Sequence, residues 1–446
     1  MNKVDCVRIA LLPLFATSLL AQALALPGPL ELSLHRAIEL ANSPEGNTNV
    51  QLSGEALKQA KMRQLEARSA LLPDLESSFT ARSQTENLAA LGLNQAIHVP
   101  IPGFAIPNLV GPYNTTDARV TGNQTLFDFS SWRRFQASRS GVSAARSDID
   151  NTHQNVAAQV ARAYLAAQKA QTDVETAEAN IKLSQAVLAQ AEHQKIAGTG
   201  TGIEVTRAKV QLANDRQRLL DAQNQLRAAS LRLLRVIGLR LDTDLRLTDK
   251  LEYTPIDAVT LEQARAEAIR QRADLRAQQD REAQARLTAD ATKMERLPSV
   301  AAFADYGSIG TAITSSLPTR TYGISVRVPI FDGARRDARR AESASQYRQE
   351  RIRTNDLKEQ VELDVRLALD DLQSAEDQVK VASEGLDLAQ QELTQARRRY
   401  DAGVATSLEV TDAQTRLERA RDNQTAALYL YNVARVDLAQ ATGRPQ

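Results

Sequence analysis

Hydrophobic positions in two long stretches of the chain recur with the seven-residue period of a coiled coil. In the later stretch, large side chains stand at Val365, Leu372, Val379, Leu386, Leu393 and Tyr400. Alanine takes the other core position, at Ala368, Ala375, Ala382, Ala389 and Ala396. The earlier stretch repeats this register 205 residues before, at Val174, Ile181 and Leu188 beside Ala163, Ala170, Ala177 and Ala191. Small residues at every second core site let neighbouring helices approach closely. The pattern predicts helices over about 130–196 and 333–400, each roughly 100 Å long.

A short Gly-rich segment follows each of these stretches. The two segments read "AGTGTGIEV" and "AGVATSLEV", and each contains a helix-stopping glycine, Gly198 or Gly403. Each then resumes with threonine and, three residues later, glutamate, which is the capping-box pattern of a helix start. These pairs are Thr201 with Glu204 and Thr406 with Glu409. We therefore expect two helical hairpins, whose second helices end at Gly238 and Gly443.

Four shorter segments alternate with a period of two and read as strands. The clearest is "TYGISVRVPIF", where Tyr322, Ile324, Val326, Val328 and Ile330 alternate with polar or small residues. The segment "DARVTGNQTLF" and those after Pro73 and Pro298 complete the set. About ten residues suffice for a tilted strand to cross an outer membrane, and an aromatic cluster where strand meets helix fits an interface belt. This cluster is Phe127, Phe129 and Trp132. Hairpins packed on a soluble core remain the alternative.

Matched motifs at nearly constant offsets show that the chain is a duplication. Gly198 and Gly403, like Gly238 and Gly443, lie 205 residues apart. The predicted organisation is a first repeat over 26–240, a linker over 241–258 and a second repeat over 259–446. The first repeat carries about 21 additional residues, from Asn94 to Asn114. Four prolines oppose a regular strand there, so we expect this segment to be an outward-facing loop.

The N-terminus has the pattern of a secretory signal peptide, residues 1–25, with an A-x-A site at Ala23 to Ala25. The single cysteine, Cys6, belongs to this segment, so the mature chain is expected to contain none. Aromatic residues make up only 4% of the chain, which is typical of long helices and not of a compact enzyme. The formal net charge of +1 argues against nucleic acid as a partner.

No pattern of catalytic, cofactor-binding or metal-binding residues is present. The histidines are scattered without ligand spacing, at His35, His98, His153 and His193. We therefore expect a protein that is not an enzyme and needs no cofactor.

Taken together, these motifs resemble the TolC-like outer-membrane efflux proteins. The chain shares the duplicated halves, the "LP" before a strand, the "FD" entering the long helix and the "YxxGxxxxxEV" hairpin tip. The resemblance implies a mainly α fold with a β-barrel part, in which a homotrimer forms a 12-stranded barrel in the lipid of the outer membrane. A periplasmic helical tunnel would continue the barrel and dock on a membrane-fusion adaptor and an inner-membrane pump or ABC transporter. The strand number per chain comes from the sequence, and the number of chains from the resemblance.

The hairpin tips hold the candidate functional residues. Glycine exposes backbone to close approach by another helix pair, so we expect the adaptor to contact the tips at Gly198, Gly200, Gly202, Gly403, Val404 and Ser407. The resemblance further implies a periplasmic gate and acidic selectivity ring at Tyr400, Glu204, Glu409 and Asp412. Ala405 stands where the family has a gate arginine, so the resemblance does not explain how that part of the gate would be held closed. Both glutamates could instead serve only as helix caps.

Two functions are therefore weighed. The first is a passive exit duct for tripartite efflux or type I secretion. The second is a secreted coiled-coil adaptor or structural protein. An adaptor should carry a lipoyl-like or β-barrel segment beside one hairpin, whereas this sequence has two hairpins and four membrane-length strands. The sequence does not indicate the exported cargo or the class of pump.

Overall fold

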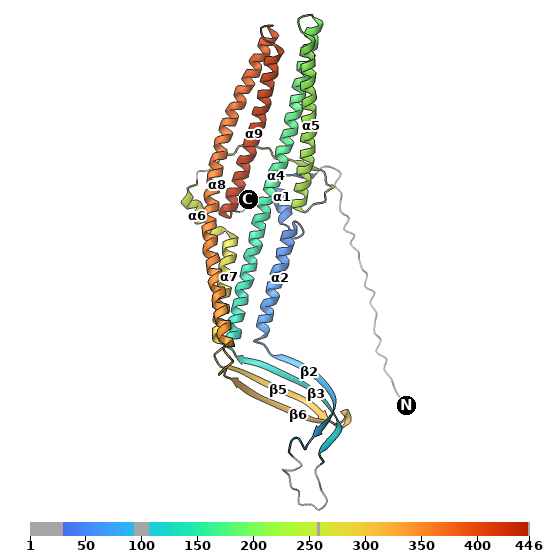
Figure 1. Ribbon diagram of the computed structural model, residues 1–446, viewed down its shortest axis with the longest axis vertical. Helices are drawn as coiled ribbons and strands as arrows, with labels where there is room; N and C mark the ends of the chain where they lie inside the picture. Colours follow the sequence, from blue (N-terminus) through green and yellow to red (C-terminus); the bar gives the residue numbers. More distant parts are fainter. Residues whose placement is uncertain (1–29, 93–106, 257–258, 445–446) are drawn as a thin grey trace, which may run out of the picture.

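The computed structural model describes residues 30–92, 107–256 and 259–444 of the chain. Two helical hairpins form one end of an elongated molecule and a four-stranded sheet forms the other (Figure 1). The predicted signal peptide with Cys6 lies outside the described residues, as does the greater part of the predicted 94–114 loop.

The two longest helices run from the sheet to the hairpin tips. They are α4 (Phe129–Ile196) and α8 (Arg335–Asp401), with 68 and 67 residues. Each turns back into a shorter helix, α5 (Gly202–Ile237) or α9 (Ser407–Thr442). The turn glycines Gly198 and Gly403 have φ values of 74° and 73°, in the left-handed region that glycine adopts without a steric penalty. The predicted hairpins are confirmed.

Shorter helices cover the sheet-side half of the long ones. In the first half of the chain these are α1 (Leu34–Asn42) and α2 (Thr48–Ser69), and in the second half α6 (Leu261–Gln271) and α7 (Ala273–Met294). Helix α7 packs against both α4 and α8 and so joins the two halves. A parallel pair of short strands, β1 (Leu30–Leu32) and β4 (Leu245–Leu247), ties the start of the described chain to the segment between the halves.

Most of the predicted heptad seam of α8 is buried, and Leu372, Ala382 and Leu386 are half-buried. Its core positions include Val365, Val379 and Tyr400, which are 0%, 5% and 5% exposed. In α4 the prediction is only partly correct, because Val174, Ile181 and Leu188 are half-buried. The buried seven-residue series there consists of small residues, Ala170, Ala177, Ser184 and Ala191. The alanines belong to the predicted register, but the larger side chains beside them stand at its edge.

The sheet is antiparallel, in the order β2-β3-β5-β6. Its strands are β2 (Asp74–Asn87), β3 (Leu109–Phe127), β5 (Ser299–Gly310) and β6 (Leu317–Arg327), with a 3-10 turn, η1 (Ile313–Ser315), between the last two. The four predicted strands per chain are confirmed, and the long helices leave the sheet at one end (Figure 1).

Two strand boundaries differ from the prediction. Strand β3 begins at Leu109, so the end of the predicted 94–114 loop is part of the sheet. Pro112 fits because the register shifts opposite it, between Gln84 and Glu86, where no ladder donor is needed. Strand β6 ends at Arg327, which excludes Val328 and Ile330. The residue between those two is Pro329, whose nitrogen cannot donate to the ladder.

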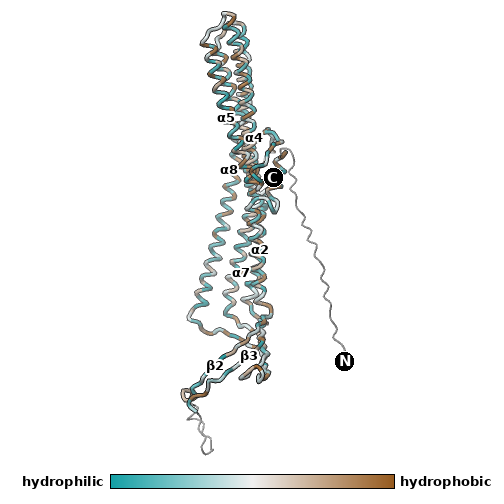
Figure 2. The backbone as a smooth tube through the Cα atoms, turned by 90° about the vertical axis from the view of Figure 1, so that its right-hand side faces the viewer, coloured by the Kyte–Doolittle hydropathy of each residue, from teal (hydrophilic) through white to brown (hydrophobic). Residues whose placement is uncertain are grey.

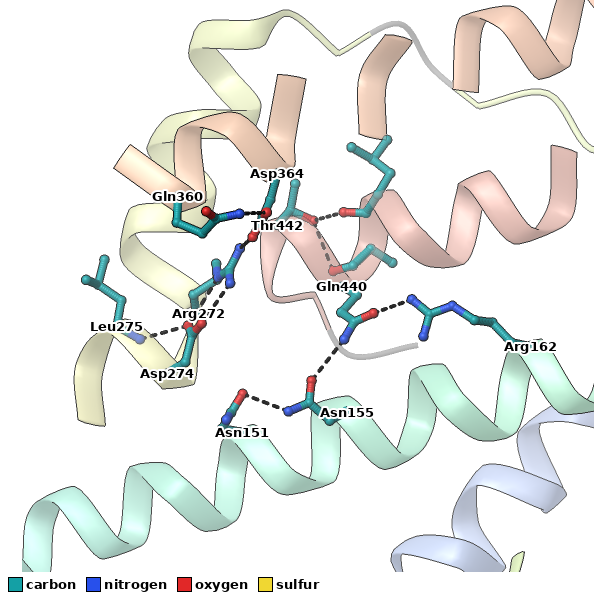
Figure 3. A network of polar contacts seen from close by, with 12 residues as sticks. Asn151, Asn155, Arg162, Arg272, Asp274, Leu275, Gln360, Asp364, Gln440 and Thr442 are labelled. Carbon is teal, nitrogen blue, oxygen red and sulfur yellow. Dashed lines mark hydrogen bonds and ion pairs between the residues drawn. The ribbon is translucent and has the colours of Figure 1, made fainter. Parts of the chain in front are cut away.

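A polar network joins the helices where the two halves meet (Figure 3). Arg272, between α6 and α7, donates to Asp274 and to Asp364 of α8, both at 2.7 Å. Arg162 of α4 pairs with Asp437 of α9 at 2.6 Å. The Arg272 side chain is only 14% exposed, and its charge-assisted hydrogen bonds to Asp274 and Asp364 compensate its buried charge. These contacts connect α4 and α9 and tie the α6–α7 junction to α8.

Candidate functional site

One face of the sheet is apolar although it is exposed on the isolated chain. Cross-strand pairing places seven large side chains on this face: Leu75, Phe79, Val120, Tyr306, Tyr322, Ile324 and Val326. Their exposed fractions lie between 47% and 79%. Arg320, which pairs with Tyr306, also lies on this face. An exposed, mainly apolar surface of this kind is a liability in water. It matches the outward face of a strand set that crosses a lipid bilayer.

The opposite face of the sheet is polar and charged. It carries Glu76, Ser78, Asp117, Arg119, Thr121, Asn123, Asp305, Thr321 and Ser325. Arg119 bridges two strands, because its guanidinium lies 2.9 Å from Asp117 and 3.1 Å from Asp305. A polar face of this composition is suited to a water-filled interior.

Aromatic side chains gather where β3 passes into α4. Phe127 and Phe129 meet edge to face at 4.4 Å, and Trp132 lies 6.1 Å from Phe135. All but the last are at least 41% exposed on the isolated chain. Such amphipathic or aromatic groups are enriched at the membrane–water boundary. The cluster therefore marks the level at which the strands leave the lipid and the helices begin.

The helices are of a different kind from the sheet. Hydrophilic and hydrophobic residues alternate along the hairpins throughout their length (Figure 2). None of the described helices combines the length and the apolar character needed to cross a membrane.

The hairpin tips present most of the predicted docking residues to solvent. Gly198, Gly202, Gly403 and Val404 are exposed, and Gly200 is half-buried. A side chain at Gly198, Gly202 or Gly403 would meet no neighbouring atom within 4 Å. Ser407 is only 6% exposed at the start of α9, whereas the other predicted docking residues are exposed or half-buried. It lies near Glu204 of the other hairpin and so does not add to the outer surface of the tip.

Exposed apolar side chains at the tips escaped the sequence reasoning. These are Ile196, Ile203 and Leu408, which are 84%, 58% and 50% exposed, and the predicted Val404 beside them is 69% exposed. Ile203 and Leu408 are equivalent in the two repeats, since they stand 205 residues apart. The sequence signal for Ile203 and Leu408 is the order of hydrophobe, Glu and Val that both tips share. In this motif Val205 and Val410 are buried, whereas Ile203 and Leu408 are exposed. Exposed apolar groups beside open glycines are characteristic of a surface that a partner covers.

The structure brings three of the tip residues together across the two hairpins. Glu204 accepts a hydrogen bond from the Thr201 backbone at 2.8 Å. This bond lowers the pKa of Glu204, with smaller contributions from the Thr201 hydroxyl and from Ser407. Tyr400 packs nearby, and its buried hydroxyl has no hydrogen-bond partner among the described residues. Burial raises the pKa of Tyr400, and the carboxylates of Glu204 and Asp401 add to this effect.

Glu409 and Asp412 lie apart from this contact. Glu409 stands in the first turn of α9, where no side-chain capping hydrogen bond forms at Thr406. Its carboxylate pairs with Arg399 of its own hairpin at 3.1 Å. Ala405 occupies the position where the family has a gate arginine. Arg399 supplies an arginine at the tip, but its ion pair with Glu409 lies within one hairpin and does not link the two. Asp412 is exposed and has no ion-pair or hydrogen-bond partner within the described ranges. Its charge is available to the space around the tip.

Comparison with known proteins agrees with these features. The model of the outer membrane efflux protein family matches residues 47–239 and 264–444. The outer membrane efflux protein BepC of Brucella suis is 26% identical over 360 residues, which are 76% of this chain and 77% of BepC. The pyoverdine export outer membrane protein OpmQ of Pseudomonas putida is 23% identical over 421 residues, 92% of this chain and 85% of OpmQ.

The fold also occurs in solved channels. The Campylobacter jejuni CmeC outer membrane channel superposes with a TM-score of 0.79 at 15% identity, covering 92% of this chain and 85% of CmeC. The alternative of a periplasmic adaptor or structural protein is not supported, because both repeats match the efflux channel family. The two matched repeats, the amphipathic four-stranded sheet and the paired helical hairpins show that this chain belongs to the outer membrane efflux protein family, whose members are outer-membrane channels with a periplasmic helical tunnel.

Proposed function

We propose that three copies of this chain close a single 12-stranded barrel in the outer membrane. The observation that carries this proposal is the open sheet: β2 and β6 each pair on one side only within the chain. Backbone groups at such edges cannot stay unpaired in lipid. Four strands are too few to close on themselves around a lumen. Closure by neighbouring copies would satisfy both edges, turn the apolar face to lipid and turn the polar face inward.

The helices would then form a periplasmic tunnel that ends at the hairpin tips. There the exposed glycines and apolar side chains would dock on the hairpin of a membrane-fusion adaptor, which an inner-membrane pump or ABC transporter accompanies. In this arrangement the chain is a passive exit duct with no reaction of its own. The repeats would occupy residues 26–240 and 259–446, joined by the segment 241–258, after removal of a signal peptide over 1–25.

Purification from outer membranes tests this assignment. The protein should run on unheated gels as an oligomer of three chains that heat converts to monomer, and it should form pores in planar bilayers. A stable monomer without pore activity would contradict the proposal. BepC is an efflux protein and OpmQ a pyoverdine export protein, so pyoverdine is a suitable first substrate for transport assays.

The account predicts that Asp412 sets ion selectivity at the tunnel entrance. Three copies of this exposed carboxylate around the trimer axis would concentrate cations and repel anions. Reversal potentials of Asp412→Ala in planar bilayers should show weaker cation selectivity than the wild type. Glu409→Ala should change selectivity less, because Arg399 already compensates the charge of Glu409. Wild-type selectivity in Asp412→Ala at low salt, where screening is weakest, would remove Asp412 from the pathway.

A further inference from the structure

Two buried carboxylates and an arginine, Arg218, whose side chain is 55% exposed, connect the two hairpins away from their tips. Asp215 of α5 and Glu418 of α9 have side chains that are 0% and 4% exposed. They stand 13 and 11 residues beyond the starts of α5 and α9, which is roughly 15–20 Å along the helices. They are therefore separate from the contact of Glu204 with Tyr400. Carboxylates are rarely buried to this degree unless charged or polar partners surround them.

Shared partners bring the two carboxylates into one cluster. Arg218 of α5 forms an ion pair with Glu418 across the hairpins and lies 4.0 Å from Asp215. The amide of Gln211 donates to Asp215 at 3.1 Å and to Glu418 at 3.3 Å. The hydroxyl of Ser184 on α4 donates to Asp215. Ser184 occupies the position of the α4 seam between Ala177 and Ala191, so a polar residue stands where the helix pattern otherwise has alanine.

Negative charge is in excess around this cluster. Its own charges are two carboxylates and one guanidinium. Other ionisable groups near it include Lys169 and Asp173 of α4, Asp221 of α5, and Arg421 and Asp422 of α9. A cavity of about 570 Å³ between the hairpins is lined by several of these groups, including Lys169, Asp173, Arg218 and Asp422. Water can therefore deliver protons to the edge of the cluster.

We propose that Asp215, Arg218 and Glu418 form an inter-hairpin latch that acid strengthens, so that protonation holds the periplasmic end of the channel closed. Arg218 can neutralise only one of the two buried carboxylates. At neutral pH the remaining charge opposes close packing of the hairpins, because an uncompensated buried charge is unfavourable. Protonation of Glu418 removes that charge, and the Arg218 guanidinium can then pair with the Asp215 carboxylate. The inference rests on the proposed channel function.

The direction of the pH effect follows from the titration of Glu418. Burial raises the pKa of Glu418 above its ordinary value of 4.5, and the charge of Asp215 adds to this effect. Burial and Asp173 likewise raise the pKa of Asp422 one helical turn away. A group with a raised pKa in the packed state binds protons more tightly there than in a separated, hydrated state. Packing is therefore favoured at acid pH, and this contribution is lost as the pH rises through the raised pKa.

Single-channel recording of the full-length oligomer in planar bilayers tests the latch. Between about pH 8 and pH 5, the closed-to-open ratio of the wild type should rise with acidity, by at most about tenfold per pH unit for each proton bound. Glu418→Gln is nearly isosteric and permanently neutral. It should show the acid-like closed ratio throughout and lose most of the pH response. Arg218→Met leaves both carboxylates without the guanidinium and should instead favour the open state at neutral pH.

Glu392→Gln is the matched control, since Glu392 pairs with Arg416 within one hairpin and its side chain is 43% exposed. It should keep the wild-type pH profile. Unheated gels show whether each variant still assembles. The latch would be overturned if the closed-to-open ratio of the wild type did not change with pH, or if Glu418→Gln had the same pH profile as the wild type. Pore formation in the same recordings would still support the channel function. Absence of pores in the wild type would instead contradict the channel function.

Discussion

Gly403→Leu should abolish export while the oligomer remains in the outer membrane. Gly403 lies at the outer end of the second hairpin, where an added side chain would project into open space. The isolated chain can thus hold the leucine, but a docked adaptor hairpin cannot approach the backbone as closely. Overpacking of a close contact costs about 1–3 kcal/mol, and three such sites in the proposed trimer would weaken docking by about a hundredfold or more. Drug accumulation or cargo secretion in cells measures the loss.

The variant also strains the backbone, because Gly403 has a φ of 73°. Two further variants separate strain from bulk. Gly403→Ala carries the strain with almost no bulk and should retain most export. Gly202→Leu adds the bulk at the start of α5, where the site is equally open and the backbone is not left-handed. It should lose export like Gly403→Leu. Loss in Gly403→Ala with normal export in Gly202→Leu would show that only the turn conformation matters.

Tyr322→Lys should prevent stable assembly in the outer membrane. Tyr322 is at the middle of β6 on the apolar face and is 79% exposed on the isolated chain. A lysine on the lipid side near the bilayer midplane costs about 2–4 kcal/mol per chain. In the proposed trimeric barrel, three copies raise this cost to about 6–12 kcal/mol, which is comparable to the usual stability of a folded domain, about 5–15 kcal/mol. The amount of heat-modifiable oligomer in the outer-membrane fraction reports the effect.

The adjacent residue gives the matched control. Thr321 lies on the polar face, opposite Asp305 of β5. Thr321→Lys introduces the same charge in the same strand but on the water side, next to an acidic group. Assembly of this variant should be close to that of the wild type. Equal loss in both variants would mean that the two faces of the sheet meet the same environment.

The architecture could be predicted from the sequence because the hydrophobic periodicity is strong and occurs in both repeats. The hairpin turns follow from Gly198 and Gly403, and the four strands from the alternation that β6 shows most clearly. The errors occur where a local device overrides the period. Pro112 enters β3 through a register shift, and Pro329 ends β6 before the alternation does. In α4, burial follows the alanines and Ser184 more closely than the large side chains.

The functional surface was less accessible, because a single helix pattern does not determine contacts between hairpins. Glu204 and Glu409 occupy equivalent positions, yet one approaches Tyr400 and the other pairs with Arg399. The pairing of Arg218 with Glu418 joins residues 200 positions apart and has no local signature. The exposure of Ile203 and Leu408 likewise depends on which side of each tip packs against the neighbouring helices. These features required the three-dimensional arrangement.

The central claim is that the sheet separates lipid from a water-filled pore, and cysteine labelling along β6 tests it most directly. The only cysteine of the full chain is Cys6, which the proposed signal-peptide cleavage would remove, so single cysteines can be introduced elsewhere and labelled specifically. A charged thiol reagent should label Thr321→Cys and Ser325→Cys in intact outer membranes and reduce their pore conductance. It should leave Ile324→Cys and Val326→Cys unlabelled within the lipid. Labelling without this alternation, or faster labelling of Ile324→Cys and Val326→Cys, would contradict the account.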